Sequence, residues 1–223
     1  MMTKKTNWLF NPYKKNEINI IPLFANPLLQ IQLDLDTDKL TELAVQMQNK
    51  DKKGRADIIN KGGWQSNNIA EEPHEEFKKL KKEITQYLQL YHSEVFRGMK
   101  FKGNVTQSID NMWLMINEKH HYVDWHIHHK ATLSGVYYIK HDGVENGNIM
   151  FKHPEHPQMS ALHWKKELVE VWDMTSGELF IIPPKSNMLL IFPSWLEHAV
   201  EVNLKDDPRI SLSFNSILLS EII

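Results

Sequence analysis

The stretch Arg209-Ile-Ser-Leu-Ser-Phe-Asn215 alternates strictly between polar and apolar side chains. Because successive side chains of a β-strand point to opposite faces, this pattern predicts a strand with one polar and one apolar face. A buried arginine is costly unless its charge is paired. The polar face therefore predicts a cavity for an anionic ligand, in which Arg209 and Ser211 are suited to hold a carboxylate. The alternative is an exposed edge strand on which Arg209 makes a surface ion pair.

Short runs of β-branched and aromatic residues, separated by Gly, Pro, Asn and Asp, extend on both sides of that strand from about residue 104 onward. The predicted strands lie near 105–116, 122–128, 132–140, 148–151, 167–173, 178–182, 188–192, 198–203 and 209–218. Eight or nine short strands with no helix between them are typical of an antiparallel sandwich or barrel rather than a parallel sheet.

The first 103 residues have a different character, with two apolar stripes at helical spacing. The predicted elements are a strand over 29–35, a helix from Asp36 or Thr37 to about Gly54, and a helix from Pro73 to Gly98. The apolar stripes of the helices need a sheet to bury them. We therefore predict a single domain over residues 1–223, in which residues 1–103 pack on a β-core formed by residues 104–223.

Composition excludes several classes of protein and of site. The 26 Lys+Arg and 28 Asp+Glu give a net charge of −2, which argues against a nucleic-acid partner. No apolar run approaches the ~20 residues of a membrane helix, and the N-terminus has no signal-peptide pattern. We therefore expect a soluble cytoplasmic protein with no membrane partner, whose oligomeric state the sequence leaves open. The absence of cysteine excludes thiolate ligands and leaves histidine to form any metal site.

Histidine is abundant, and nine of the 12 histidines lie between His120 and His163. In the segment Asp124-Trp-His126-Ile-His128, three alternate side chains are expected on one face of an extended chain. Two imidazoles spaced in this way can bind one metal ion, although a lone His-x-His is more often an ordinary surface or hydrogen-bonded pair. A distant third histidine, His198, follows a turn at the start of another predicted strand.

Together these segments resemble the 2-oxoglutarate/Fe(II) oxygenases of bacteria and phages, within the double-stranded β-helix dioxygenase superfamily. The matching segments are His126-Ile-His128, Leu133-Ser-Gly-Val-Tyr-Tyr138, Leu189-Leu-Ile-Phe-Pro-Ser-Trp-Leu-Glu-His198, Arg209-Ile-Ser-Leu-Ser-Phe-Asn215, Ile21-Pro-Leu-Phe24 and Trp113-Leu-Met-Ile-Asn117. The resemblance covers most of the chain. It implies a mainly β fold with N-terminal helices, in which the strands form a double-stranded β-helix, a cupin-like jelly roll.

The resemblance also implies an enzyme, a dioxygenase that uses Fe(II), 2-oxoglutarate and O₂. The implied site residues are His126, His128 and His198 for the metal, and Arg209 and Ser211 for the distal carboxylate of 2-oxoglutarate. Asn117 is either a further contact of 2-oxoglutarate or a strand-end residue that closes a turn. The implied reaction decarboxylates 2-oxoglutarate to succinate and hydroxylates a small molecule or a protein side chain.

Two departures from the family pattern bear on the site. Ser186-Asn187 replaces a glycine turn, and we expect the turn to survive because asparagine tolerates a left-handed backbone. His128 stands where the wider superfamily has a carboxylate, and three imidazoles also suit Zn, Cu and Ni. Bound 2-oxoglutarate would then supply the neutralising charge. Asp124 is expected to orient an imidazole or to serve as the alternative acidic ligand.

Several further residues remain open. One of Tyr137 and Tyr138 must face inward, because neighbouring side chains of a strand alternate. Trp125 and Trp195 flank the proposed ligands and either line a substrate pocket or shield the metal from water, whereas His153, His156 and His163 belong to a polar loop over the site. Two rival functions also remain: a cupin-like three-histidine metal enzyme that does not use 2-oxoglutarate, and a non-catalytic β-sandwich binding module.

Overall fold

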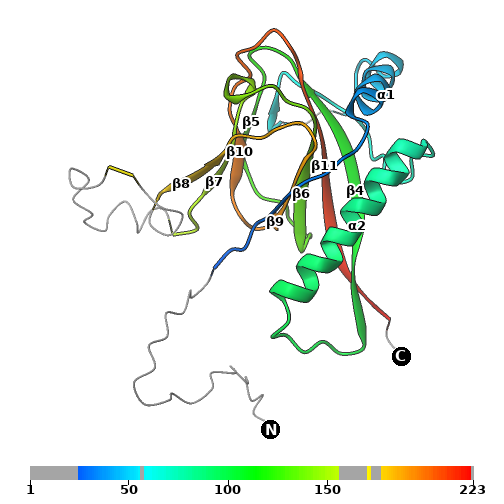
Figure 1. Ribbon diagram of the computed structural model, residues 1–223, viewed down its shortest axis with the longest axis vertical. Helices are drawn as coiled ribbons and strands as arrows, with labels where there is room; N and C mark the ends of the chain where they lie inside the picture. The colour runs from blue at the N-terminus through cyan, green and yellow to red at the C-terminus, as the bar shows by residue number, and fades with distance from the viewer. Residues whose placement is uncertain (1–24, 56–57, 156–169, 172–176, 222–223) are drawn as a thin grey trace.

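Two antiparallel sheets form the body of the protein, and both helices lie beside one of them (Figure 1). The computed structural model describes residues 25–55, 58–155, 170–171 and 177–221. The larger sheet has the order β1-β9-β6-β11-β4-β3, and the smaller has the order β2-β5-β10-β7-β8. Sequential strands therefore often lie in opposite sheets, so that residues far apart in the chain come together between them.

Within the described parts of the chain, six strands form the larger sheet and five form the smaller one. The larger sheet comprises β1 (Leu29–Gln32), β3 (Trp64–Gln65), β4 (Asn104–Asn117), β6 (Leu133–Lys140), β9 (Met188–Pro193) and β11 (Arg209–Glu221). The smaller sheet comprises β2 (Asn60–Lys61), β5 (Tyr122–His126), β7 (Ile149–Lys152), β8 (Leu179–Ile182) and β10 (His198–Val200). The helices are α1 (Thr37–Lys50) and α2 (Glu75–Val95), with a 3₁₀ turn at Val144–Asn146. The mainly β prediction is thus confirmed.

The alternation of β11 sorts its side chains between two environments. Ile210, Leu212 and Phe214 are buried in a core shared with the apolar stripes of α1 and α2. Arg209 and Ser211, on the other face, line a cavity between the two sheets. The helices therefore cover the apolar face of the larger sheet, and its polar face lines the cavity.

The helices begin as elementary physical chemistry expects, but they are shorter than their predicted ranges. Asp36 caps α1, because its Oδ1 accepts a hydrogen bond of 2.9 Å from the backbone N–H of Lys39. Helix α1 ends at Lys50 and α2 ends at Val95, before Gly54 and Gly98. Among the described residues, no helix is both long and apolar enough to cross a membrane.

The predicted strands are present wherever the structure describes them, although those over 29–35, 122–128 and 198–203 end earlier, at Gln32, His126 and Val200. Two short strands were not predicted. Strands β2 and β3 have two residues each, which is too short for any periodicity to appear in the sequence. The strand predicted near 178–182 is β8, whereas the one near 167–173 falls mostly outside the described residues. The turn at Asn187 survives as expected, with a left-handed φ of 69°. Its side chain also accepts hydrogen bonds from the backbone of Leu35 and the hydroxyl of Tyr137.

Gly135 shows why the centre of β6 requires glycine. An added Cβ would lie 2.5 Å from the carbonyl oxygen of Leu190 and would overlap the ring of Phe214. The backbone of the neighbouring strand β9 cannot shift to make room without breaking sheet hydrogen bonds, because Gly135 and Ile191 are paired in the sheet.

We expect Gly135→Ala to lower the free energy of unfolding by about 1–3 kcal/mol, the usual cost of overpacking a core. Gly98→Ala is the matched control, because nothing lies within 4 Å of its added Cβ. Urea unfolding of the two variants measures the difference. Equal stability of both variants would contradict the packing described for β6.

Candidate metal centre and co-substrate cavity

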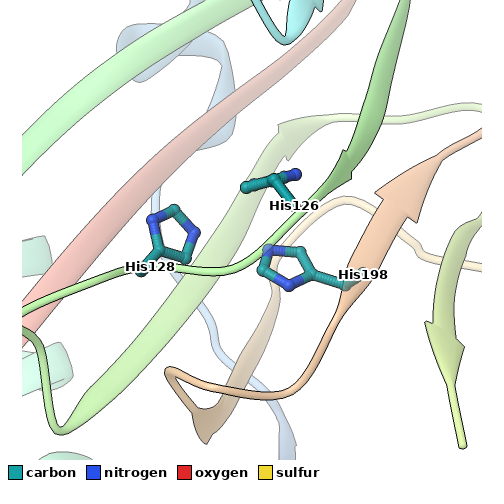
Figure 2. Close-up of side chains that lie close together, drawn as sticks. All are labelled: His126, His128 and His198. Atoms are coloured by element: carbon teal, nitrogen blue, oxygen red, sulfur yellow. The ribbon is translucent and has the colours of Figure 1, made fainter.

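Three histidine side chains converge between the sheets (Figure 2). His126 is the last residue of β5, His128 lies in the loop that follows, and His198 is the first residue of β10. Their candidate ligand atoms all lie within 4.8 Å of one another. The pairing of His198 with His126 across β10 and β5 brings these residues, 72 positions apart, face to face. Such a cluster has the spacing needed to bind one metal ion.

Backbone carbonyls fix the orientation of two of these rings. The Nδ1 of His126 lies 2.8 Å from the carbonyl oxygen of Asp124, and the Nδ1 of His198 lies 2.8 Å from that of Leu196. Because a carbonyl oxygen can only accept, each Nδ1 carries the proton and each Nε2 keeps its lone pair. Second hydrogen bonds of this kind orient the imidazole ligands of many metal sites.

Burial favours the neutral form of His128 and His198, which is the form that a metal requires. It lowers the pKa of His128 to about 3, with a further contribution from the neighbouring His126 and His129. Burial also lowers the pKa of His198 well below its ordinary value, since only 4% of that residue is exposed. The ring of Phe192 packs edge-on against His198 at a centroid distance of 4.7 Å. A metal would therefore meet ligands that need not lose a proton at neutral pH.

The position of Asp124 differs from the expectation that it shares a face with His126 and His128. Val200 pairs with Val123 while His198 pairs with His126, so that β5 contains one residue more than β10 over this interval. This bulge interrupts the alternation of side chains. Asp124 then lies outside the described cavity lining, and its carboxylate accepts from the backbone N–H of Trp125. Its backbone carbonyl, rather than its side chain, is the group that orients His126.

A cavity of about 200 Å³ connects the histidines with Arg209. Its lining includes Asn117 and Ser211, which the sequence analysis singled out, and Tyr138, which resolves the choice between the two tyrosines. Tyr137 lies instead in the core beneath the helices. The lining contains two further aromatic residues, Phe192 and Trp113, and the ring centroid of Trp113 lies 5.9 Å from that of His128.

Among the described residues, backbone carbonyls and not an acid hold Arg209 in place. Its Nη1 donates hydrogen bonds to the carbonyl oxygens of Asn146 and Glu201, at 2.6 and 3.2 Å. The guanidinium can approach this closely because residue 147 is glycine, where any Cβ would overlap Nη1. Burial lowers the pKa of Arg209 to about 10, which leaves it charged at neutral pH.

Two polar groups at this end of the cavity lack a partner among the described residues. They are the Nη2 of Arg209 and the hydroxyl of Tyr138, and both are buried. Burial raises the pKa of Tyr138, so that its hydroxyl remains a hydrogen-bond donor. Unpaired buried donors are costly, and a pair of them beside a positive charge fits an anionic ligand such as a carboxylate.

Of the other candidates, Asn117 lines the cavity, whereas Trp125, Trp195 and His153 do not. Asn117 donates from its Nδ2 to Asn60 and pairs with Arg209 across β4 and β11, so that it borders the cavity at the arginine end. Trp125 packs under the amine of Lys152, and Trp195 is 54% exposed, so neither belongs to the described lining. His153 is described but lies outside that lining, whereas His156 and His163 fall outside the described residues.

Comparisons with known proteins agree with this geometry. Residues 111–215 match the family model described as "Putative 2OG-Fe(II) oxygenase". No curated protein matches the sequence.

Several solved structures share the fold at low sequence identity. The non-haem α-ketoglutarate-dependent carbocyclase SnoK from nogalamycin biosynthesis is 12% identical, with a TM-score of 0.59 over 86% of this chain and 79% of its own. A Pseudomonas putida prolyl-4-hydroxylase is 14% identical, with a TM-score of 0.56 over 85% and 92%. HygX from Streptomyces hygroscopicus, determined with iron bound, is 12% identical, with a TM-score of 0.53 over 89% and 84%. The sheets thus form the double-stranded β-helix of these enzymes.

We expect His128→Gln to weaken Zn(II) and Fe(II) binding at least tenfold, because one imidazole of the cluster is lost. His129→Gln is the matched control, since His129 is adjacent, exposed and not part of the cluster. Anaerobic metal titration by calorimetry measures both, with circular dichroism to verify the fold. Equal losses in the two variants, or none in His128→Gln, would remove His128 from the site.

Proposed function

We propose that the protein is a 2-oxoglutarate/Fe(II) oxygenase, as the family model that matches residues 111–215 suggests, and we propose which residues carry the reaction and what each one does. His126, His128 and His198 hold Fe(II), while Arg209, Tyr138 and Ser211 hold the distal carboxylate of 2-oxoglutarate. The observation that carries the proposal is one small cavity that joins three imidazoles to a buried guanidinium, whose Nη2 has no partner among the described residues.

The residues present fit both groups. Three neutral imidazoles suit a divalent transition metal, and they leave coordination positions for a chelating keto acid. The unpartnered donors of Arg209 and Tyr138 suit the carboxylate at the other end of that acid. Because none of the three metal ligands is a carboxylate, the negative charge of 2-oxoglutarate would balance the charge of the metal.

The chain itself positions the reactants and keeps water away. Backbone carbonyls hold the rings of His126 and His198, so that the metal side of the cavity needs little reorganisation. The buried guanidinium fixes the far end of 2-oxoglutarate, and Phe192 shields His198. When bound, Fe(II) and 2-oxoglutarate supply the oxidising chemistry that uses O₂, releases succinate and CO₂, and hydroxylates a C–H bond. We propose a small molecule or a protein side chain as the substrate, and not a nucleic acid.

We expect Tyr138→Phe to weaken 2-oxoglutarate binding about tenfold, the cost of one hydrogen bond to a charged group. Stability should stay unchanged or rise, since the hydroxyl has no partner among the described residues. Tyr137→Phe should instead lower the stability and leave 2-oxoglutarate binding unchanged, because the hydroxyl of Tyr137 donates a hydrogen bond to Asn187 in the core. Anaerobic calorimetry and urea unfolding, applied to both variants, measure the two effects. The assignment fails if Tyr138→Phe keeps full affinity for 2-oxoglutarate.

We expect Arg209→Lys to weaken 2-oxoglutarate binding at least 100-fold, because lysine lacks the planar fork and cannot reproduce its hydrogen bonds. Metal affinity should change less than threefold, since the arginine is not in the histidine cluster. Competition binding on the folded variant measures both constants. Unaltered dependence on 2-oxoglutarate would favour the rival three-histidine enzyme that does not use this co-substrate.

A further inference from the structure

A second arginine lines the same cavity and has no role in the proposed function. The sequence contains three arginines, Arg55, Arg97 and Arg209, among 26 basic residues. Two of the three, Arg55 and Arg209, line the cavity that contains the histidine cluster. Lysine is much the commoner base in this chain, and the cavity lining that the structure describes contains none.

The main chain at Arg55 is fixed although its side chain is exposed. The backbone N–H of Arg55 donates to the carbonyl oxygen of Gln65 at 2.8 Å, next to the short strand β3. Gly54 has a left-handed φ of 58° and packs so closely on Trp64 and Gln65 that no Cβ would fit. The carboxylate of Asp51 accepts from the N–H of Gly54 at 3.1 Å. Arg55 thus lines the cavity from a backbone position that hydrogen bonds and close packing hold in place.

No acidic side chain offsets the charge of Arg55 within the cavity. The described lining residues include neither Asp nor Glu, and no ion pair of Arg55 is found in the part of the chain that the structure describes. Neutral amides and hydroxyls, from Gln65, Asn111 and Ser213, supply the other polar lining. The ionised groups among the described lining residues are therefore all cationic.

With Fe(II) and 2-oxoglutarate bound, no described lining residue neutralises the charge of Arg55. The two charges of Fe(II) are matched by the two of 2-oxoglutarate, and the histidines that hold the metal are neutral. The guanidinium groups of Arg209 and Arg55 then give the loaded cavity a net positive charge, which attracts anions. A carboxylate in the metal triad would have reduced that charge, but His128 occupies its place.

We propose that Arg55 binds an oxyanion group, a carboxylate or a phosphate, on the substrate that is oxidised. Arginine suits this task because its planar fork binds such groups through two parallel hydrogen bonds. Arg55 is thus a residue that determines specificity, and the substrate is an anion. This inference rests on the proposed function, which assigns the remaining cation of the cavity to 2-oxoglutarate.

The small number of arginines allows a direct test by NMR. In the Zn(II)-loaded protein, which is diamagnetic, three Nε–Hε signals are expected and can be assigned with Arg55→Lys and Arg97→Lys. Acetate, methylphosphonate and neutral acetamide are titrated as probes, with and without saturating 2-oxoglutarate. Arg55→Gln is compared with Arg97→Gln, whose exposed arginine follows α2 and does not line the cavity.

We expect the Arg55 signal to shift saturably with an oxyanion and not with acetamide. Arg55→Gln should weaken oxyanion binding at least tenfold, and Arg97→Gln should change it less than twofold. Saturation by acetate identifies a carboxylate substrate, and saturation by methylphosphonate alone identifies a phosphate. The inference is overturned if the Arg55 signal moves no more than that of Arg97, or if Arg55→Gln binds as tightly as the unaltered chain.

The same spectra separate this inference from the proposed function. 2-Oxoglutarate should shift the Arg209 signal, whatever happens at Arg55. If Arg209 fails to respond while Arg55 saturates with an oxyanion, the proposed function is wrong and the anion site remains. If Arg209 responds and Arg55 does not, only the anion site is wrong.

Discussion

The burial of Arg209 between two sheets constrains the structure around it. A guanidinium that is 2% exposed must find hydrogen-bond acceptors, and the chain supplies two backbone carbonyls, from Asn146 and Glu201. A glycine at position 147 makes room for this contact. Among the described residues no acid pairs with this charge, so the site is suited to an anionic ligand. Arg209 is thus stabilised enough for the protein to fold while its remaining donor stays free to bind.

The strand that carries Arg209, β11, contributes to both the hydrophobic core and the cavity. The apolar face of β11 completes the core beneath α1 and α2, and its polar face lines the cavity. Across the cavity, the short strands β5 and β10 bring His126 and His198 together. Neutral imidazoles at one end and a cation at the other give this cavity the polarity that a metal-chelating dicarboxylate requires. The site is therefore a consequence of how the two sheets face each other.

Much of this arrangement could be predicted from particular residues. The alternation of Arg209 to Asn215 predicted both the strand and the cavity, and the two-residue spacing predicted that His126 and His128 could share a metal. The third ligand, His198, was predicted from the resemblance to the oxygenase family. The position of Asp124 could not be predicted, since a β-bulge leaves no periodic signal in a single sequence. The choice of Tyr138 over Tyr137 likewise depended on the register of β6 against β11.

Two features of the cavity depend on contacts between distant segments and could not be predicted from local sequence patterns. Gly147 is one glycine among nine, and its role appears only where it meets Arg209, 62 residues later. Arg55 lies in a stretch with no strand or helix pattern, and it reaches the cavity because Gly54 packs on Trp64. The rarity of arginine in a lysine-rich chain was a signal that could have drawn attention to Arg55.

The central claim is that the histidine cluster and Arg209 together bind Fe(II) and 2-oxoglutarate in one cavity. The most direct test is an anaerobic absorption titration of the Fe(II)-loaded protein with 2-oxoglutarate. We expect a visible charge-transfer band that grows until one equivalent of 2-oxoglutarate is bound. A folded, iron-loaded protein that develops no such band would contradict the claim.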